Sequence, residues 1–153
     1  TGADFSPEML AIARAKGLRK TVVADALRLP FPDDAFDCAT VAFGLRNMVD
    51  WNVALREMAR VLASHGHLLV LDFSIPRWPW RTPYRFYLHR CLPWLAAFLT
   101  GQKDAYDYLG ASIEIFPSGN VMLRLIESNG FANANAQEMT GGVVTMYTAQ
   151  KSL

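Results

Sequence analysis

Apolar positions recur with two different spacings along the first half of the chain. Short β-branched or nearly continuous apolar runs predict strands, whereas apolar residues three or four apart predict helices. Helices follow two start signals, Ser6-Pro7-Glu8 and Asp50, and a turn is expected at 64–66. Alternation of strands and helices predicts βαβ units and a parallel sheet. The predicted strands are 1–4, 21–24, 36–43 and 67–73, the last two buried on both faces.

The second half of the chain has a different pattern. Residues 75–103 contain arginine, lysine and three of the 4 tryptophans, but no acid. Helical spacing follows at 105–115 and 120–128, and alternating residues on both sides of Thr140-Gly141-Gly142 predict an antiparallel hairpin. We therefore expect one α/β domain over residues 1–153, with 75–117 inserted into it.

Composition narrows the class of protein. The chain has 153 residues, 52% of them hydrophobic and 19% charged, which excludes a disordered or low-complexity protein. The net charge of +1 gives no reason to expect nucleic acid as a partner. Cys38 and Cys91 are too few for a disulfide scaffold, and no metal-ligand spacing predicts a metal site. Cys38, in a predicted buried strand, is expected to be an inert core thiol.

No apolar run is long enough to predict a transmembrane helix, and no signal peptide is recognised. We expect a cytoplasmic protein. Tryptophans mixed with arginines in 75–103 suit a bilayer interface, so peripheral contact with the inner face of the membrane is expected. The alternative is that these aromatic residues pack onto the sheet.

Acidic residues follow two of the predicted strands. Ligands of open α/β sheets bind outside the carboxyl ends of the strands, and Asp4 and Asp25 occupy such positions. One carboxylate can accept bonds from both hydroxyls of a ribose, and a second can accept one from an adenine amino group. Together they suggest a cofactor that contains a nucleoside. The alternative is that both acids are ordinary turn and helix caps.

Several motifs resemble those of a known family. Asp25-Ala26 followed by Leu29-Pro30-Phe31-Pro32-Asp33 resembles class I S-adenosylmethionine-dependent methyltransferases, which have a Rossmann-like fold. Narrower motifs resemble the ubiquinone/menaquinone biosynthesis C-methyltransferases, which methylate polyprenyl benzoquinols or naphthoquinols such as demethylmenaquinol. These motifs are Phe43-Gly44-Leu45-Arg46-Asn47, Leu71-Asp72-Phe73-Ser74, Tyr108-Leu109, Ser112-Ile113, Phe116-Pro117 and Thr140-Gly141-Gly142-Val143-Val144.

The resemblance implies S-adenosyl-L-methionine as the cofactor and a polyprenyl quinol as the substrate. It implies that Asp4 binds the ribose, that Asp25 and Ala26 hold the adenine, and that Ala42 contacts the cofactor through its backbone. The family opens with a strand and a Gly-x-Gly loop, which none of the 10 glycines here makes. The chain is therefore expected to be N-terminally truncated, with the first strand belonging between 1–4 and 36–43.

Arg46 and Asn47 are the candidate catalytic residues. An arginine is a poor base because its pKa exceeds about 12, so Arg46 is expected to stabilise a developing quinolate oxygen while Asn47 orients it. The alternative is that Arg46 makes a structural ion pair. The inserted segment 75–117 is expected to form a lid over the substrate.

Two other functions stay open. One is methylation of another lipid or small molecule, against which the Gly44–Asn47 and Thr140–Gly142 motifs argue. The other is a non-catalytic fragment that binds neither cofactor nor substrate. Unpaired strand edges on either side of the expected first strand would favour pairing with a second copy of the chain.

Overall fold

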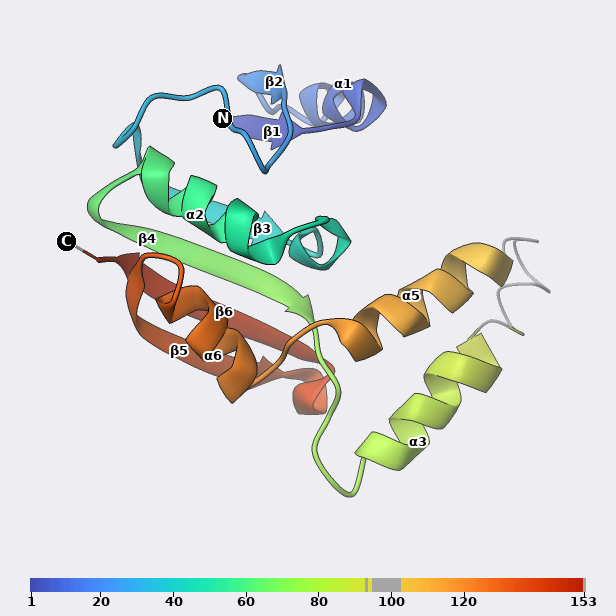
Figure 1. Ribbon diagram of the computed structural model, residues 1–153. Coiled ribbons are helices and arrows are strands. Elements are labelled where there is room, and N and C mark those ends of the chain that lie inside the picture. Colours follow the sequence, from blue (N-terminus) through green and yellow to red (C-terminus); the bar gives the residue numbers. More distant parts are fainter. Residues whose placement is uncertain (93, 95–102, 153) are drawn as a thin grey trace.

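The computed structural model describes residues 1–92, 94 and 103–152, and it contains the expected mixture of strands and helices (Figure 1). Their bounds are β1 Gly2–Asp4, α1 Pro7–Ala15, β2 Thr21–Val23, β3 Phe36–Ala42, η1 Leu45–Asn47, α2 Trp51–Val61, β4 Leu62–Phe73, α3 Arg81–Phe86, η2 Tyr87–Cys91, α5 Lys103–Ile115, α6 Asn120–Glu127, β5 Phe131–Met139, η3 Thr140–Gly142 and β6 Val144–Lys151. The predicted strands and helices are present near their expected positions, but β4 begins at Leu62 rather than at 67, and the helical turns α3 and η2 were not predicted.

The strands form two separate sheets in the described part of the chain. One is 2-stranded, with β1 parallel to β2, and the other is 4-stranded in the order β3-β4-β6-β5. Within the larger sheet β3 and β4 are parallel, whereas β6 runs antiparallel to both β4 and β5. The parallel pairs and the terminal antiparallel hairpin therefore confirm the predicted sheet.

The free edge of β3 corrects one prediction. The sequence predicts that residues 36–43 are buried on both faces, but β3 is half-buried or exposed throughout. Cys38 is exposed as well, so the prediction of a core thiol is wrong. The reason is that, among the described residues, β3 pairs only with β4, on one side. The expected position of a further strand, between β1 and β3, is therefore an unpaired edge, and association with a second copy stays a prediction.

Local signals set both helix starts. The Ser6 side chain accepts a hydrogen bond from the Met9 backbone N–H, and the Asp50 side chain accepts bonds from Asn52 and Val53 N–H groups. Residues 64–66, predicted as a turn, instead continue β4 opposite a register shift, with His65 at φ 62°. A Cβ at Gly66 would lie 2.8 Å from the Ala63 carbonyl oxygen, so glycine is required at this bulge.

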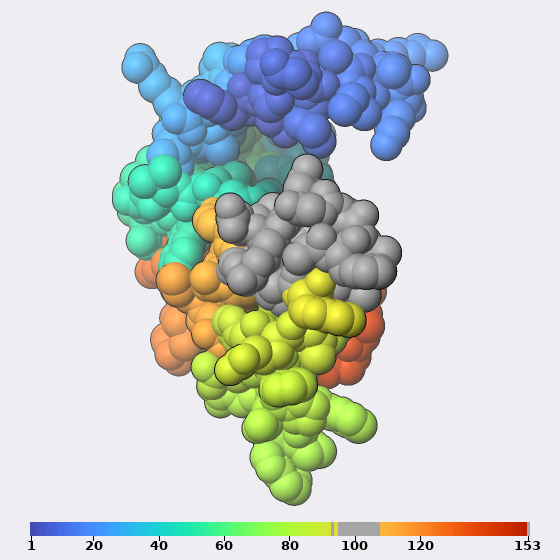
Figure 2. All heavy atoms as spheres, turned by 90° about the vertical axis from the view of Figure 1, so that its right-hand side faces the viewer, coloured from blue at the N-terminus to red at the C-terminus, as the bar shows by residue number. Residues whose placement is uncertain are grey.

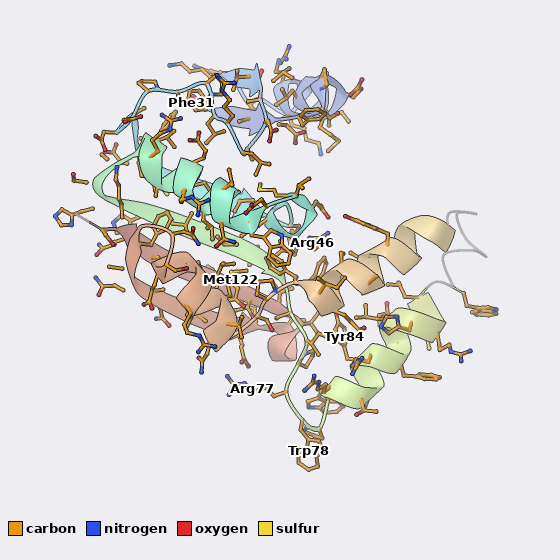
Figure 3. The ribbon with its side chains drawn as sticks, viewed as in Figure 1. Phe31, Arg46, Arg77, Trp78, Tyr84 and Met122 are labelled. Atoms are coloured by element: carbon orange, nitrogen blue, oxygen red, sulfur yellow. The ribbon has the colours of Figure 1, made fainter. Side chains whose placement is uncertain are left out.

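The core lies where α2 and α6 cover the four-stranded sheet (Figure 3, where Met122 is labelled). Leu55 of α2, Met122 of α6 and Tyr147 of β6 are among its fully buried side chains. The Trp51 ring meets the Phe116 ring edge to face at 5.4 Å, which joins α2 to the end of α5. This core contains no residue of β1, α1 or β2.

The inserted segment projects from the end of β4. Helix α3 and the π-helical turn η2 form its first arm, and α5 forms the second (Figure 1). Turned by 90°, the molecule shows the β1–β2 unit at one end and the first arm at the other (Figure 2). Residues 93 and 95–102 of the predicted insertion lie outside the described residues.

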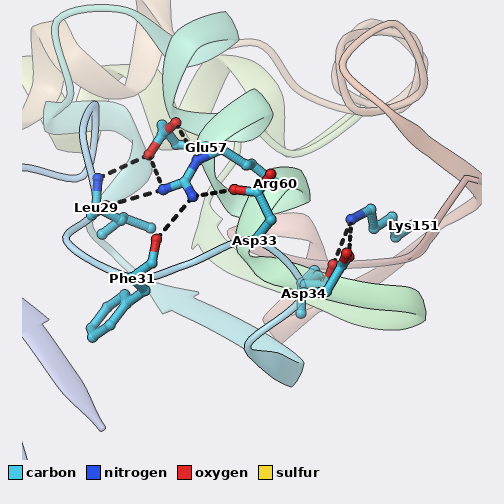
Figure 4. Close-up of polar contacts among 8 residues, drawn as sticks. Leu29, Phe31, Asp33, Asp34, Glu57, Arg60 and Lys151 are labelled. Carbon is cyan, nitrogen blue, oxygen red and sulfur yellow. Dashed lines mark hydrogen bonds and ion pairs between the residues drawn. The ribbon is translucent and has the colours of Figure 1, made fainter.

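One arginine ties the loop after β2 to helix α2 (Figure 4). The Arg60 guanidinium donates to the carbonyl oxygens of Phe31 (2.8 Å) and Leu29 (3.0 Å) and to Asp33 Oδ1 (2.7 Å). Glu57 accepts two bonds from Arg60 and one from the Leu29 N–H, at 2.9 Å each. The hydrogen bond from Arg60 is the main reason that the pKa of Glu57 is lowered. This cluster holds the loop that carries Asp25 and Ala26.

We predict that Glu57 makes folding stability sensitive to acid. Its pKa is lowered in the folded state, so its contribution is present above the usual glutamate pKa of about 4.3 and is lost in the acidic range below that value. In Glu57→Gln, urea midpoints measured by circular dichroism should therefore change less over this range than in the parent chain. Exposed Glu127 provides the control. An equal flattening in Glu127→Gln would contradict the prediction.

Candidate functional site

The carboxyl ends of neighbouring strands bring the predicted site residues together in two groups. At the end of β1, the Ala24 N–H donates to the Asp4 carbonyl at 3.0 Å, so the residues after β1 and β2 lie side by side. At the end of β3, the Phe43 N–H donates to the Leu71 carbonyl at 2.7 Å, which places Ala42 beside the end of β4. The first group holds Asp4, Asp25 and Ala26, and the second holds Ala42, Arg46 and Asn47.

Asp4 and Asp25 both act as local caps, the alternative that the sequence left open. Asp4 Oδ1 accepts from the Ser6 N–H at 2.8 Å, and Asp25 Oδ1 accepts from the Leu27 N–H at 2.9 Å. Both side chains are exposed. A carboxylate has about four acceptor positions, so one local bond leaves each acid able to accept hydroxyl or amino donors. Capping and ligand binding are therefore compatible here.

Arg46, labelled in Figure 3, makes a buried ion pair with Asp72, which lies at the end of β4. Its Nη1 lies 2.7 Å from Asp72 Oδ1 and 2.8 Å from the Phe43 carbonyl oxygen. The side chains are 10% and 0% exposed. The Arg46 Cζ lies 5.1 Å from the centre of the Phe73 ring, within cation–π range. The structural ion pair considered from the sequence is thus present.

Asp72 lies in one of the motifs recognised in the sequence, but sequence reasoning gave it no role. Besides the guanidinium, it accepts from the backbone N–H groups of Arg46 (3.3 Å) and Phe73 (2.9 Å). A buried carboxylate needs such partners because burial without them is very unfavourable. An acid at the end of the apolar run 68–71 was the available signal. Asp72 fixes both the Arg46 side chain and the start of η1.

Asn47 faces the inserted segment. It is exposed, and the Tyr108 hydroxyl of α5 lies 3.5 Å from Asn47 Oδ1. The Asn47 Nδ2 lies 3.5 Å from the Phe43 carbonyl oxygen. Both distances are long for hydrogen bonds, so the amide is only loosely held. A residue of the insertion thus meets a predicted catalytic residue across 61 positions of sequence.

The two arms of the inserted segment are joined by one glutamate. Glu114 Oε1 of α5 lies 2.6 Å from Arg85 Nε and 3.1 Å from His89 Nε2, both on the first arm. Hydrogen bonding to His89, supported by Arg85, lowers the pKa of Glu114.

Trp78, Trp80 and Trp94 are 87%, 67% and 70% exposed. The alternative that these tryptophans pack onto the sheet is therefore wrong.

Comparison with models of protein families identifies the family of this chain. The model of the ubiE/COQ5 methyltransferase family matches residues 1–151. The chain belongs to this family. The match includes the motifs at 43–47, 71–74 and 140–144 and confirms the resemblance drawn from them.

Two relatives show how much of the family's length is present. The demethylmenaquinone methyltransferase of Mycolicibacterium gilvum is 43% identical over 150 residues, which cover 97% of this chain and 65% of the relative. The demethylmenaquinone methyltransferase of Thermus thermophilus is also 43% identical, and the match covers 98% of this chain and 70% of the relative. The chain thus spans about two thirds of the length of these relatives.

Solved structures confirm the predicted Rossmann-like fold. An S-adenosylmethionine-dependent methyltransferase of Thermotoga maritima matches 99% of this chain and 72% of its own, with a TM-score of 0.70 and 19% identity. A Mesorhizobium loti S-adenosylmethionine-dependent methyltransferase matches 98% of this chain and 79% of its own, with a TM-score of 0.65 and 17% identity. At these identities the likeness concerns the fold alone.

We predict that Asp72→Asn strongly destabilises the chain. The variant leaves the buried Arg46 guanidinium without a charged partner, which should lower the free energy of unfolding by about 3–5 kcal/mol. Urea denaturation followed by circular dichroism measures the change. Exposed Asp37 on β3 supplies the control, and Asp37→Asn should shift stability by less than about 0.5 kcal/mol. A loss for Asp72→Asn as small as the control's would show that the pair contributes little.

Proposed function

We propose that the protein methylates a ring carbon of a polyprenyl quinol, with S-adenosyl-L-methionine as the methyl donor. The observation that carries this proposal is the match of residues 1–151 to the ubiE/COQ5 methyltransferase family. The names of the relatives favour demethylmenaquinol over a benzoquinol as the substrate. This activity belongs to the menaquinone and ubiquinone biosynthetic reactions.

The acids at the ends of β1 and β2 suit the nucleoside part of the cofactor. Asp4 accepts hydrogen bonds from the ribose hydroxyls, and Asp25 with Ala26 holds the adenine. The carboxylates of Asp4 and Asp25 are exposed, and each keeps acceptor positions that its local hydrogen bond does not use, which supports this assignment. Exposed Ala42, at the end of β3, contacts the cofactor through its backbone. When bound, S-adenosyl-L-methionine supplies an electrophilic methyl group on its sulfonium.

Arg46 and Asn47 act on the quinol oxygen. Arg46 stabilises the negative charge that develops on this oxygen, and Asn47 orients the ring. Because Asp72 and the Phe43 carbonyl already hold Nη1, Arg46 acts through the rest of its guanidinium plane. Asp72 is a positioning residue that keeps this plane in place. Proximity of the ring carbon to the methyl group supplies much of the rate enhancement.

The inserted segment 75–117 covers the quinol. It also contacts the bilayer from which the quinol is taken. Exposed aromatic side chains and arginines share the first arm, a combination suited to the interface of an anionic membrane. The contacts of Glu114 with both Arg85 and His89 hold the two arms together. In the described part of the chain, no helix has the length and apolarity needed to cross a bilayer.

We predict that cofactor affinity and turnover depend on different residues. With the protein expressed from its complete gene, Asp4→Asn should weaken S-adenosylhomocysteine binding at least about ten-fold, measured by isothermal titration. Asn47→Ala should lower kcat for methyl transfer to a tailless demethylnaphthoquinol about 100-fold and leave that affinity within about two-fold. Asn47 is exposed, so its variant should fold normally.

Exposed Arg124 of α6 serves as the control for this experiment, since Arg124→Ala should change neither quantity. Unchanged turnover in Asn47→Ala would remove the proposed role of this residue. Failure of the parent protein to transfer a methyl group to the quinol would overturn the proposed function itself.

We predict binding to anionic vesicles through the first arm and through Trp78, which precedes it. The protein should co-sediment with phosphatidylglycerol vesicles, less at high salt, and Trp78→Ser should reduce the bound fraction at least about two-fold. Phe5 is a matched control because it is 79% exposed but lies on the β1–β2 unit. Equal loss in Phe5→Ser, or no binding by the parent protein, would count against this membrane contact.

A further inference from the structure

An apolar pocket lies between the inserted segment and the turn that joins β5 to β6. Its volume is about 350 Å³, within the range of small-molecule sites. None of the described residues that line it carries a charge. The lining residues are Pro76, Trp80, Pro83, Tyr84, Thr140, Gly141 and Val143.

The glycine turn forms one wall of this pocket. Thr140, Gly141 and Gly142 have φ angles of 50°, 66° and 89°, which turn the backbone back toward the start of the insertion. A Cβ at Gly142 would lie 3.3 Å from the Pro76 Cα, so only glycine permits this approach without a shift. The Ser74 N–H donates to the Val143 carbonyl at 2.9 Å, and its hydroxyl donates to the Gly142 carbonyl at 2.8 Å. The turn is therefore fixed to the end of β4.

The first arm of the insertion forms the opposite wall. Trp80 immediately precedes α3, and Pro83 and Tyr84 lie in its first turns. Tyr84 is half-buried, and this burial raises the pKa of its phenol, which stays neutral at physiological pH. The wall therefore presents rings and no charge to the pocket.

The glycine turn of the pocket and Arg46 are both fixed to the end of β4. Ser74, which holds the glycine turn, is two residues beyond Asp72, which holds Arg46. In the view of Figure 3, Tyr84 lies between Arg46 and Trp78. A ligand with a polar ring near Arg46 and an apolar chain could thus place the chain in this pocket and continue toward exposed Trp78.

We propose that this pocket binds the first isoprene units of the quinol's polyprenyl tail. This inference rests on the proposed function, which supplies a substrate with such a tail. An isoprenoid chain has no hydrogen-bonding group, so an uncharged wall of proline, tryptophan and valine suits it. The motif Thr140-Gly141-Gly142 thereby serves the substrate tail, whereas Phe43–Asn47 serves the ring.

Farnesol tests this proposal without the ring or the methyl donor. We expect ¹⁵N-labelled chain to show farnesol-dependent shifts of the Gly141 and Val143 amide resonances. Trp80→Asp, which places a charge in the pocket wall, should raise the Kd for farnesol at least about ten-fold. Phe5→Asp is the matched control, since Phe5 is also an exposed aromatic residue but does not line the pocket, and should change the Kd less than about two-fold.

Three outcomes would overturn the proposal. They are no saturable shift at Gly141 and Val143, shifts confined to residues of β1 and β3, and an equal Kd for the parent chain and Trp80→Asp. None of these outcomes would affect methyl transfer to the tailless quinol. Conversely, loss of that transfer with normal farnesol binding would reject the proposed function and leave an isoprenoid-binding pocket.

Discussion

The buried carboxylate of Asp72 is the constraint on which the arrangement around the candidate site depends. Without partners, its charge would be very unfavourable among the apolar residues of β4. It therefore holds the Arg46 guanidinium and two backbone N–H groups. This requirement bends the chain after β3 into η1 and places Arg46 and Asn47 at the ends of β3 and β4. The arrangement proposed to act on a quinol is thus also the one that gives the buried Asp72 carboxylate its charged and hydrogen-bonding partners.

Polar contacts also fix the position of the β1–β2 unit. This unit has no side chain in the main core and no strand pairing with the larger sheet. The loop that follows it is instead bound to α2 by the Arg60 guanidinium, which bonds two carbonyl oxygens and two carboxylates. Polar contacts thereby do what sheet pairing does elsewhere in the molecule, and they hold Asp25 at its strand end.

Helix starts and the pattern of the sheet were predictable from the sequence, but individual side-chain contacts between distant residues were not. Helix starts at Ser6 and Asp50 depend on neighbouring residues alone, and both appear where they were predicted. The Arg46–Asp72 pair joins residues 26 positions apart, so no local pattern reveals it. The error at Cys38 has another cause. An apolar strand indicates burial only when it has neighbours on both sides, and β3 has one.

The position of β6 within the sheet affects how the chain folds during its synthesis. This strand lies between β4 and β5, yet it is the last of the described strands to leave the ribosome. Until then β4 lacks its antiparallel neighbour, and Lys151 cannot reach the Leu62 carbonyl and Asp34 that it later bonds. Because the contacts that complete the sheet join distant parts of the polypeptide, nascent chains expose apolar strand edges until β6 has been synthesised.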